Sequence, residues 1–125
     1  KKKKIRDFLI SFQRNFADNP PSGNGSVIDG RDITSKIIPA AEVKIYVDAD
    51  VKIRAERRVK QMKLNIKSYK KVLESLIQRD RNDKFRIESP LIKTPDSFLI
   101  DTTKNDEKRA LNIALKIVKK KIDYI

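Results

Sequence analysis

The sequence has 125 residues, of which 30 are lysine or arginine and 17 are aspartate or glutamate, giving a formal net charge of +13. It contains no cysteine, histidine or tryptophan. These absences exclude a disulfide framework, a cysteine-based metal site and catalysis by a histidine base. The length is typical of one domain, and the positive charge favours an anionic partner such as a nucleotide, a nucleic acid or a lipid surface.

The sequence shows no signal for a membrane or for secretion. No apolar run reaches the length of about 18 residues that a membrane-spanning helix needs. No basic segment followed by an apolar one, the pattern of a signal peptide, is present. Because the chain also lacks cysteine, we expect a cytoplasmic protein without a membrane partner.

The first half of the chain predicts one helix and two strands. Apolar residues at helical spacing predict a helix over residues 3–16 whose apolar face packs against a sheet. Prolines, glycines and asparagines mark residues 18–25 as a loop. The apolar runs 26–29 and 43–47 predict two short strands, separated by a helical turn that the Asp32 side chain caps.

The second half predicts three helices and one strand. The helices are expected over residues 50–62, 67–83 and 105–124, and the strand over 98–100. Val72, Leu73, Leu76 and Ile77 form the apolar stripe of the second helix. Strands that alternate with helices predict an α/β protein with a parallel sheet, and we expect a single unit over residues 1–125.

Two polar segments are candidate sites. Arg31 and Asp32 lie on a glycine turn after the strand predicted at 26–29, and ligands collect beyond the carboxyl ends of parallel strands. The alternative is a surface turn closed by a local ion pair. Arg79 and Asp83 belong to the second polar segment. Because they are four residues apart on a helix, an ordinary ion pair worth about 0.2–0.5 kcal/mol is the alternative there.

A third group of charged residues lies in the helix predicted at 50–62. Arg54, Arg57 and Arg58 occur within two turns of one another. This pattern is compatible with a solvated basic face or with a contact to RNA phosphates as well as with a nucleotide site.

Seven short motifs follow one another in a fixed order along the chain. They are Ile5-Arg6, Gln13-Arg14-Asn15-Phe16, Asp29-Gly30-Arg31-Asp32-Ile33, Arg54-Ala55-Glu56-Arg57-Arg58, Arg79-Asp80-Arg81-Asn82-Asp83, Arg86 with Ser89-Pro90-Leu91, and Asp96 with Ile100-Asp101-Thr102. In these motifs and their order the chain, from Ile5 onward, resembles the C-terminal half of a bacterial cytidylate kinase.

This resemblance implies a P-loop nucleoside monophosphate kinase fold, a parallel sheet with flanking helices, of which the first strand and the P-loop are absent. It implies transfer of a phosphoryl group from ATP to CMP or dCMP, giving CDP or dCDP, with Mg²⁺ as the metal cofactor. Phosphoryl transfer depends on positioning and charge neutralisation, so an arginine-rich chain without histidine suits it.

By the same resemblance, the substrate-binding residues are six. Arg31 and Arg86 would bind the CMP phosphate, Arg6 and Asp32 the cytosine, and Arg79 and Asp83 the ribose. Arg57 and Arg58 would be the catalytic residues, neutralising the ATP phosphates when a lid of about residues 51–83 closes.

The glycine-rich loop that holds ATP phosphates in this family ends in Gly-Lys-Ser or Gly-Lys-Thr, and the 125 residues contain no such sequence. We therefore expect the chain alone to be inactive as a kinase. The family partners would be CMP or dCMP and ATP, with no nucleic acid and a monomeric state. A basic module that binds RNA or the ribosome without catalysis is the alternative function, favoured by the charge of +13.

Overall fold

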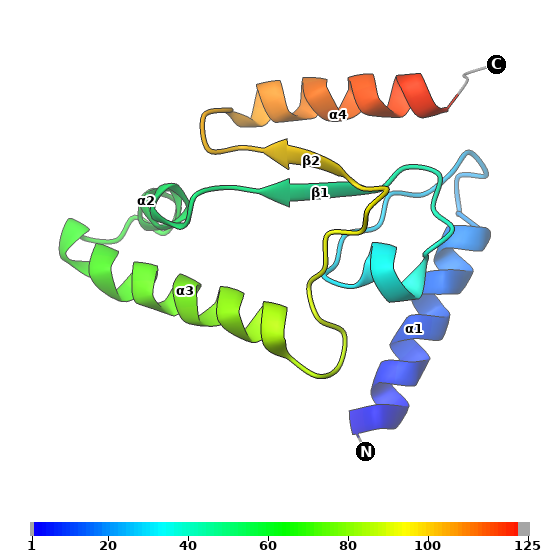
Figure 1. Ribbon diagram of the computed structural model, residues 1–125, viewed down its shortest axis with the longest axis horizontal. Coiled ribbons are helices and arrows are strands. Elements are labelled where there is room, and N and C mark those ends of the chain that lie inside the picture. The colour runs from blue at the N-terminus through cyan, green and yellow to red at the C-terminus, as the bar shows by residue number, and fades with distance from the viewer. Residues whose placement is uncertain (1, 123–125) are drawn as a thin grey trace.

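The computed structural model describes residues 2–122 of the chain (Figure 1). The elements in chain order are α1 (Lys2–Asp18), η1 (Ile33–Ile37), β1 (Ile45–Asp48), α2 (Val51–Gln61), η2 (Ile66–Ser68), α3 (Tyr69–Phe85), β2 (Phe98–Asp101) and α4 (Glu107–Lys121). The last helix begins two residues later than predicted, and position 123 and position 124 of that prediction lie outside the described residues.

The sheet consists of β1 and β2, which pair in parallel with Ile45 opposite Phe98 and Asp48 opposite Asp101. Backbone hydrogen bonds continue the pairing at both ends, from Phe98 N to Lys44 O and from Thr102 N to Asp48 O, each 2.8 Å long. The connection between the strands contains α2 and α3, and α4 lies along β2 (Figure 1). The predicted α/β class with parallel strands and flanking helices is confirmed.

The strand predicted at residues 26–29 is wrong. Residues 25–30 have no regular secondary structure, and the Val27 side chain is 98% exposed. A strand requires a partner for its backbone N–H and C=O groups. Within residues 2–122, β1 and β2 pair with each other alone, so this apolar segment has no strand to join.

The predicted packing of the first helix against a sheet is also wrong. The apolar side chains of α1 are exposed: Ile5, Phe8, Leu9, Phe12 and Phe16. The helix contacts η1 instead, because Arg14 donates hydrogen bonds from Nε to Ile37 O (2.9 Å) and from Nη2 to Lys36 O (3.2 Å). These bonds supply donors to two carbonyl groups at the C-terminal end of η1, because the last carbonyl groups of a helix lack N–H partners within the helix.

Helices α2 and α3 pack against each other and extend away from the end of the sheet (Figure 1). Ala55 and Val59 of α2 are buried. The apolar stripe predicted on the second helix is partly confirmed, since Val72, Leu73 and Leu76 are half-buried whereas Ile77 is 50% exposed.

The end of α2 has a left-handed residue, Lys63, with φ of 51°. Leu64 N donates to Val59 O (3.0 Å) and Lys63 N to Lys60 O (3.1 Å). This pair of bonds is the Schellman motif, in which glycine is the usual residue at the left-handed position. Lys63 therefore adopts a backbone conformation that a residue with a Cβ atom disfavours.

Few apolar residues of the described chain are buried. They are Ile33, Ile37, Ala49, Ala55, Val59 and Ile100. On α4, the apolar side chains of Leu111 and Leu115 are exposed. Among residues 2–122, no helix combines the length and the apolar character required to cross a bilayer.

Candidate functional site

Three arginines surround the carboxylate of Asp83. Arg31 Nε donates to Asp83 Oδ2 at 2.7 Å, Arg79 Nε lies 3.8 Å from the same oxygen, and Arg86 Nη1 lies 4.0 Å from Oδ1. The Asp83 side chain is 15% exposed, while those of Arg31 and Arg86 are 38% and 37% exposed. We call these four residues the Asp83 cluster. Its three cations and one anion leave two positive charges in excess, which favours an anionic ligand.

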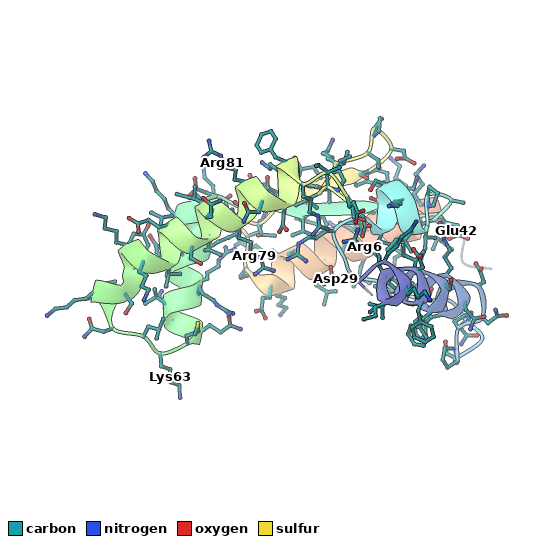
Figure 2. All side chains as sticks on the ribbon, turned by 90° about the horizontal axis from the view of Figure 1, so that it is seen from below. Arg6, Asp29, Glu42, Lys63, Arg79 and Arg81 are labelled. Atoms are coloured by element: carbon teal, nitrogen blue, oxygen red, sulfur yellow. The ribbon has the colours of Figure 1, made fainter. Side chains whose placement is uncertain are left out.

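Local sequence explains how each member reaches the cluster. Arg79 and Asp83 lie four residues apart on α3, so they share one helix face. Figure 2 shows Arg79 and Arg81 projecting from opposite sides of this helix. The helix ends before Arg86, whose N–H still bonds Asn82 O at 3.1 Å. The helix-face ion pair anticipated for Arg79 and Asp83 is therefore present, within a larger cluster.

Arg31 reaches the cluster from the turn that precedes η1. A Cβ atom on Gly30 would lie 2.8 Å from Ile33 Cγ1, and Ile33 is buried. Only glycine therefore allows the chain to pass this close to Ile33 just before Arg31. The chain bends at Arg31 and Asp32, directly after Gly30, although the strand expected before them does not form.

Asp32 begins η1 through its backbone. Its carbonyl oxygen accepts hydrogen bonds from Lys36 N (2.9 Å) and Ile37 N (3.1 Å). The side chain makes no capping bond, so the prediction that it caps this turn is wrong. Among the described residues no donor is hydrogen-bonded to the half-buried Asp32 carboxylate, which leaves it available for a ligand beside Arg31.

Arg6 lies outside the Asp83 cluster. It forms an ion pair with Glu88, and both side chains are exposed. Glu88 belongs to the segment that follows α3, so the pair connects α1 to the neighbourhood of Arg86. Exposed pairs of this kind contribute at most about 1 kcal/mol to stability.

Arg57 and Arg58 point to different partners. Arg57 donates to the loop after β2, with Nη2 2.6 Å from Thr102 O and 3.3 Å from Asn105 O. Arg58 Nη1 bonds Gln61 Oε1 on its own helix at 3.2 Å. Neither arginine bonds the Asp83 cluster within the part of the chain that is described.

A hollow of about 500 Å³ lies beside Arg57, between the end of α2 and the start of α4. Its lining includes Gln61, Thr102 and Asp106. Hydrogen bonds from the side chain and the backbone of Thr103 lower the pKa of Asp101. The backbone bond, from Thr103 N to Asp101 Oδ1, is 2.8 Å long and lies in the loop that follows β2. The hollow is thus bordered by one arginine and by polar groups held in place by their own bonds.

Sequence reasoning missed a bidentate pair between Arg54 of α2 and Asp80 of α3. Arg54 Nη1 and Nη2 bond the two Asp80 oxygens at 3.0 and 2.5 Å, and Arg54 Nε bonds Ala49 O at 3.0 Å. The bond to Asp80 raises the pKa of the Arg54 guanidinium. Burial raises the pKa of Tyr46, whose side chain lines a hollow of about 190 Å³ with this pair. The pair ties α3 to the end of β1.

Between residues 2 and 122 there is no group of three or more histidine, cysteine, aspartate or glutamate side chains that could hold a metal ion. The Asp83 carboxylate itself is engaged by three arginines. The described residues therefore do not fit a metal centre built by this chain alone.

Comparison with known proteins identifies the family. The family model for cytidylate kinase matches residues 1–120. Over 117 residues the chain is 42% identical to a cytidylate kinase of Bradyrhizobium diazoefficiens, covering 92% of this chain and 54% of that protein. It is 40% identical over 116 residues to a cytidylate kinase of Paramagnetospirillum magneticum, covering 91% and 55%. The chain spans about half the length of these curated relatives. It belongs to the cytidylate kinase family.

Proposed function

We propose that this chain supplies the acceptor-binding and lid half of an enzyme that transfers a phosphoryl group from ATP to CMP or dCMP. The observation that carries the proposal is the Asp83 cluster, in which Arg31, Arg79 and Arg86 converge on one carboxylate. Relatives that match this chain are named cytidylate kinase, which supports the nucleotide as ligand.

The phosphate of CMP would bind Arg31 and Arg86. A phosphate monoester carries about −1.5 to −2 charges at pH 7, which matches the two excess positive charges of the cluster. The planar guanidinium group can bind two phosphate oxygens at once. Asp83 accepts hydrogen bonds when it is ionised, so it would accept them from the ribose hydroxyl groups. Arg79 lies beside Asp83 and would contact the ribose with it.

The cytosine would bind Asp32, with Arg6 as the second base contact. A carboxylate accepts a hydrogen bond from the exocyclic amine of cytosine, whereas uracil has a carbonyl oxygen at that position. A site built to bind the amine rejects the base that lacks it, because its buried acceptor then stays unpaired. The available Asp32 carboxylate beside Arg31 supports this assignment.

Residues 51–83 would act as the lid, with Arg57 and Arg58 as the residues that neutralise ATP phosphates. Helices α2 and α3 make up most of this segment and pack on each other. ATP and Mg²⁺ would act in the whole enzyme, where the metal neutralises phosphate charge. The described residues offer no carboxylate cluster for the metal, and we assign no step to it. We further propose a cytoplasmic, monomeric enzyme without a nucleic-acid partner.

A competition experiment tests this function. Equilibrium dialysis with labelled CMP would measure displacement by unlabelled CMP, dCMP, UMP, AMP and a mixed-sequence RNA oligonucleotide. We expect CMP and dCMP to compete, and UMP and AMP to require at least about tenfold higher concentrations. Efficient displacement by RNA, with equal weak competition by all four nucleotides, would contradict the proposal and favour the basic RNA-binding module.

A further inference from the structure

Residues 86–91 form a strap that folds back on the Asp83 cluster. Arg86 Nε donates to Ser89 O at 2.5 Å. Leu91 N donates to the backbone oxygen of Asp83 at 2.7 Å. The strap is therefore hydrogen-bonded at its end, through Leu91, to the backbone of Asp83. Within the strap, Ser89 is hydrogen-bonded to Arg86, one of the arginines of the Asp83 cluster. Its conformation and the geometry of the cluster are coupled.

Ser89 adopts an unfavourable backbone conformation within this strap. Its φ is 57°, in the left-handed region that residues with a Cβ atom seldom occupy. The next residue is Pro90, which biases the residue before it toward extended conformations. Ser89 is 7% exposed. Strained residues of this kind persist where their surroundings fix them, and they are concentrated at ligand sites.

The hydroxyl group of Ser89 does not explain the residue's conformation. Within the described chain, Ser89 Oγ is buried and has no hydrogen-bond partner. The backbone carbonyl is the group that is used, because the left-handed turn directs it to Arg86 Nε. What the structure requires at this position is a φ value, and not a side-chain oxygen.

This bond determines which edge of the Arg86 guanidinium group remains available. A guanidinium group presents its donors in a rigid plane. With Nε held by Ser89 O and Nη1 lying 4.0 Å from Asp83 Oδ1, the plane is oriented from two sides. We propose that Ser89 is a positioning residue, which holds the Nη edge of Arg86 toward the acceptor phosphate. This inference rests on the proposed function of the Asp83 cluster.

Substitutions at position 89 separate the backbone from the hydroxyl. Ser89→Ala removes only the unpartnered hydroxyl, and Ser89→Gly allows positive φ without steric cost. Ser89→Val introduces a β-branched side chain, which strongly disfavours the left-handed region. A positioning role therefore predicts that the Ala and Gly variants behave like the native protein and that the Val variant does not.

Calorimetric titration with CMP and with cytidine isolates the phosphate contribution. We expect the ratio of the two affinities to be unchanged in Ser89→Ala and Ser89→Gly and to fall at least about tenfold in Ser89→Val. Combined with Arg86→Ala, Ser89→Val should have no further effect, because the residue acts through Arg86. An unchanged ratio in the Val variant, or an equal loss in both backgrounds, would overturn the proposal.

A second measurement needs neither nucleotide nor a variant. Hydrogen exchange of the arginine Nε–H groups, followed by NMR, should show the Arg86 Nε–H of the native protein exchanging at least about tenfold more slowly than that of exposed Arg81. Equal rates would overturn the Ser89 proposal even where Ser89→Val fails to fold. Slow Arg86 exchange together with equal affinities for CMP and cytidine would support the Ser89–Arg86 bond and contradict the proposed function.

Discussion

Arg31 Nε and Asp83 Oδ2 are joined by a 2.7 Å hydrogen bond between residues 52 positions apart in the sequence. The bond connects the glycine turn before η1 to the last turn of α3. The Asp83 side chain is largely buried and the Arg31 side chain is 38% exposed, so the pair is shielded on the carboxylate side and open on the arginine side. Arg31 is thus held in place by protein while part of its guanidinium group can meet a ligand.

This geometry predicts that Arg31→Lys weakens CMP binding nearly as much as Arg31→Ala. A lysine ammonium group keeps the charge, yet it cannot bond Asp83 and two phosphate oxygens in one plane. Loss of a charged hydrogen bond of about 1.5–3 kcal/mol corresponds to about a 10- to 100-fold loss of affinity. Calorimetry with CMP measures the loss, with Arg81→Lys, on the side of α3 opposite Arg79, as the control (Figure 2). Native affinity in Arg31→Lys would assign Arg31 a merely electrostatic role.

The assignment of Asp32 to the base predicts a change in selectivity. Asp32→Ala should weaken CMP binding by about 1.5–3 kcal/mol, since a charged acceptor for the cytosine amine is removed. UMP binding should change less, because uracil has no exocyclic amine and therefore donates no such hydrogen bond to Asp32. The measurement is the ratio of CMP to UMP affinities, with Glu42→Ala as a surface control near η1. If the ratio in Asp32→Ala equals that of the native protein, Asp32 does not read the base.

The left-handed residue at the end of α2 predicts a stabilising substitution. Lys63→Gly should raise the free energy of unfolding by about 1 kcal/mol, because glycine adopts the φ of 51° without a Cβ clash. Lys60→Gly, inside the same helix, should lower it by a similar amount. Urea unfolding of both variants measures the difference. A Lys63→Gly protein no more stable than the native one would show that the Schellman turn is not the strained element that its φ indicates.

The pair of Lys44 and Asp96 predicts acid sensitivity. Lys44 is buried, and its Nζ bonds Asp96 Oδ2 at 2.5 Å. This bond lowers the pKa of Asp96 from the ordinary 3.8. Because the folded protein binds this proton more weakly than the unfolded chain, the stabilisation is complete above pH 3.8 and is lost as pH falls through the lower folded pKa.

Unfolding experiments on Asp96→Asn test this linkage. The variant should be less stable than the native protein at pH 7, and the difference should shrink as the pH falls below the ordinary carboxyl pKa of 3.8. Asp7→Asn, on the exposed surface of α1, is a matched control and should leave the pH profile unchanged. A difference that stays constant from pH 7 to pH 3 would contradict the assignment.

The helices could be predicted because the interactions that define them are local. Asp50 Oδ1 accepts from Lys52 N at 2.8 Å at the start of α2, and Asp106 Oδ1 accepts from Arg109 N at 2.8 Å at the start of α4. Such caps, together with apolar spacing, place helix ends within about two residues. The strand expected at 26–29 failed because a strand is defined by a distant partner, which composition and periodicity cannot supply.

The site was anticipated unevenly for the same reason. The resemblance to a family grouped Arg31, Asp83 and Arg86, since it carries information about distant contacts. Reasoning from the residues alone also singled out Arg31 and Asp32 on the glycine turn, but the contact it predicted within the cluster was that of Arg79 with Asp83, four residues apart. The bond between Arg54 and Asp80 spans 26 residues and two helices, and neither residue differs from an ordinary surface charge until the helices are packed.

The most direct test of the central claim, that the Asp83 cluster binds the phosphate of a nucleoside monophosphate, is calorimetric titration of the 125-residue protein with CMP and with cytidine in one buffer. We predict that CMP binds at least about tenfold more tightly than cytidine, and that Arg31→Ala and Arg86→Ala each reduce this advantage. Equal affinities for the two ligands, or an advantage that survives both substitutions, would contradict the claim.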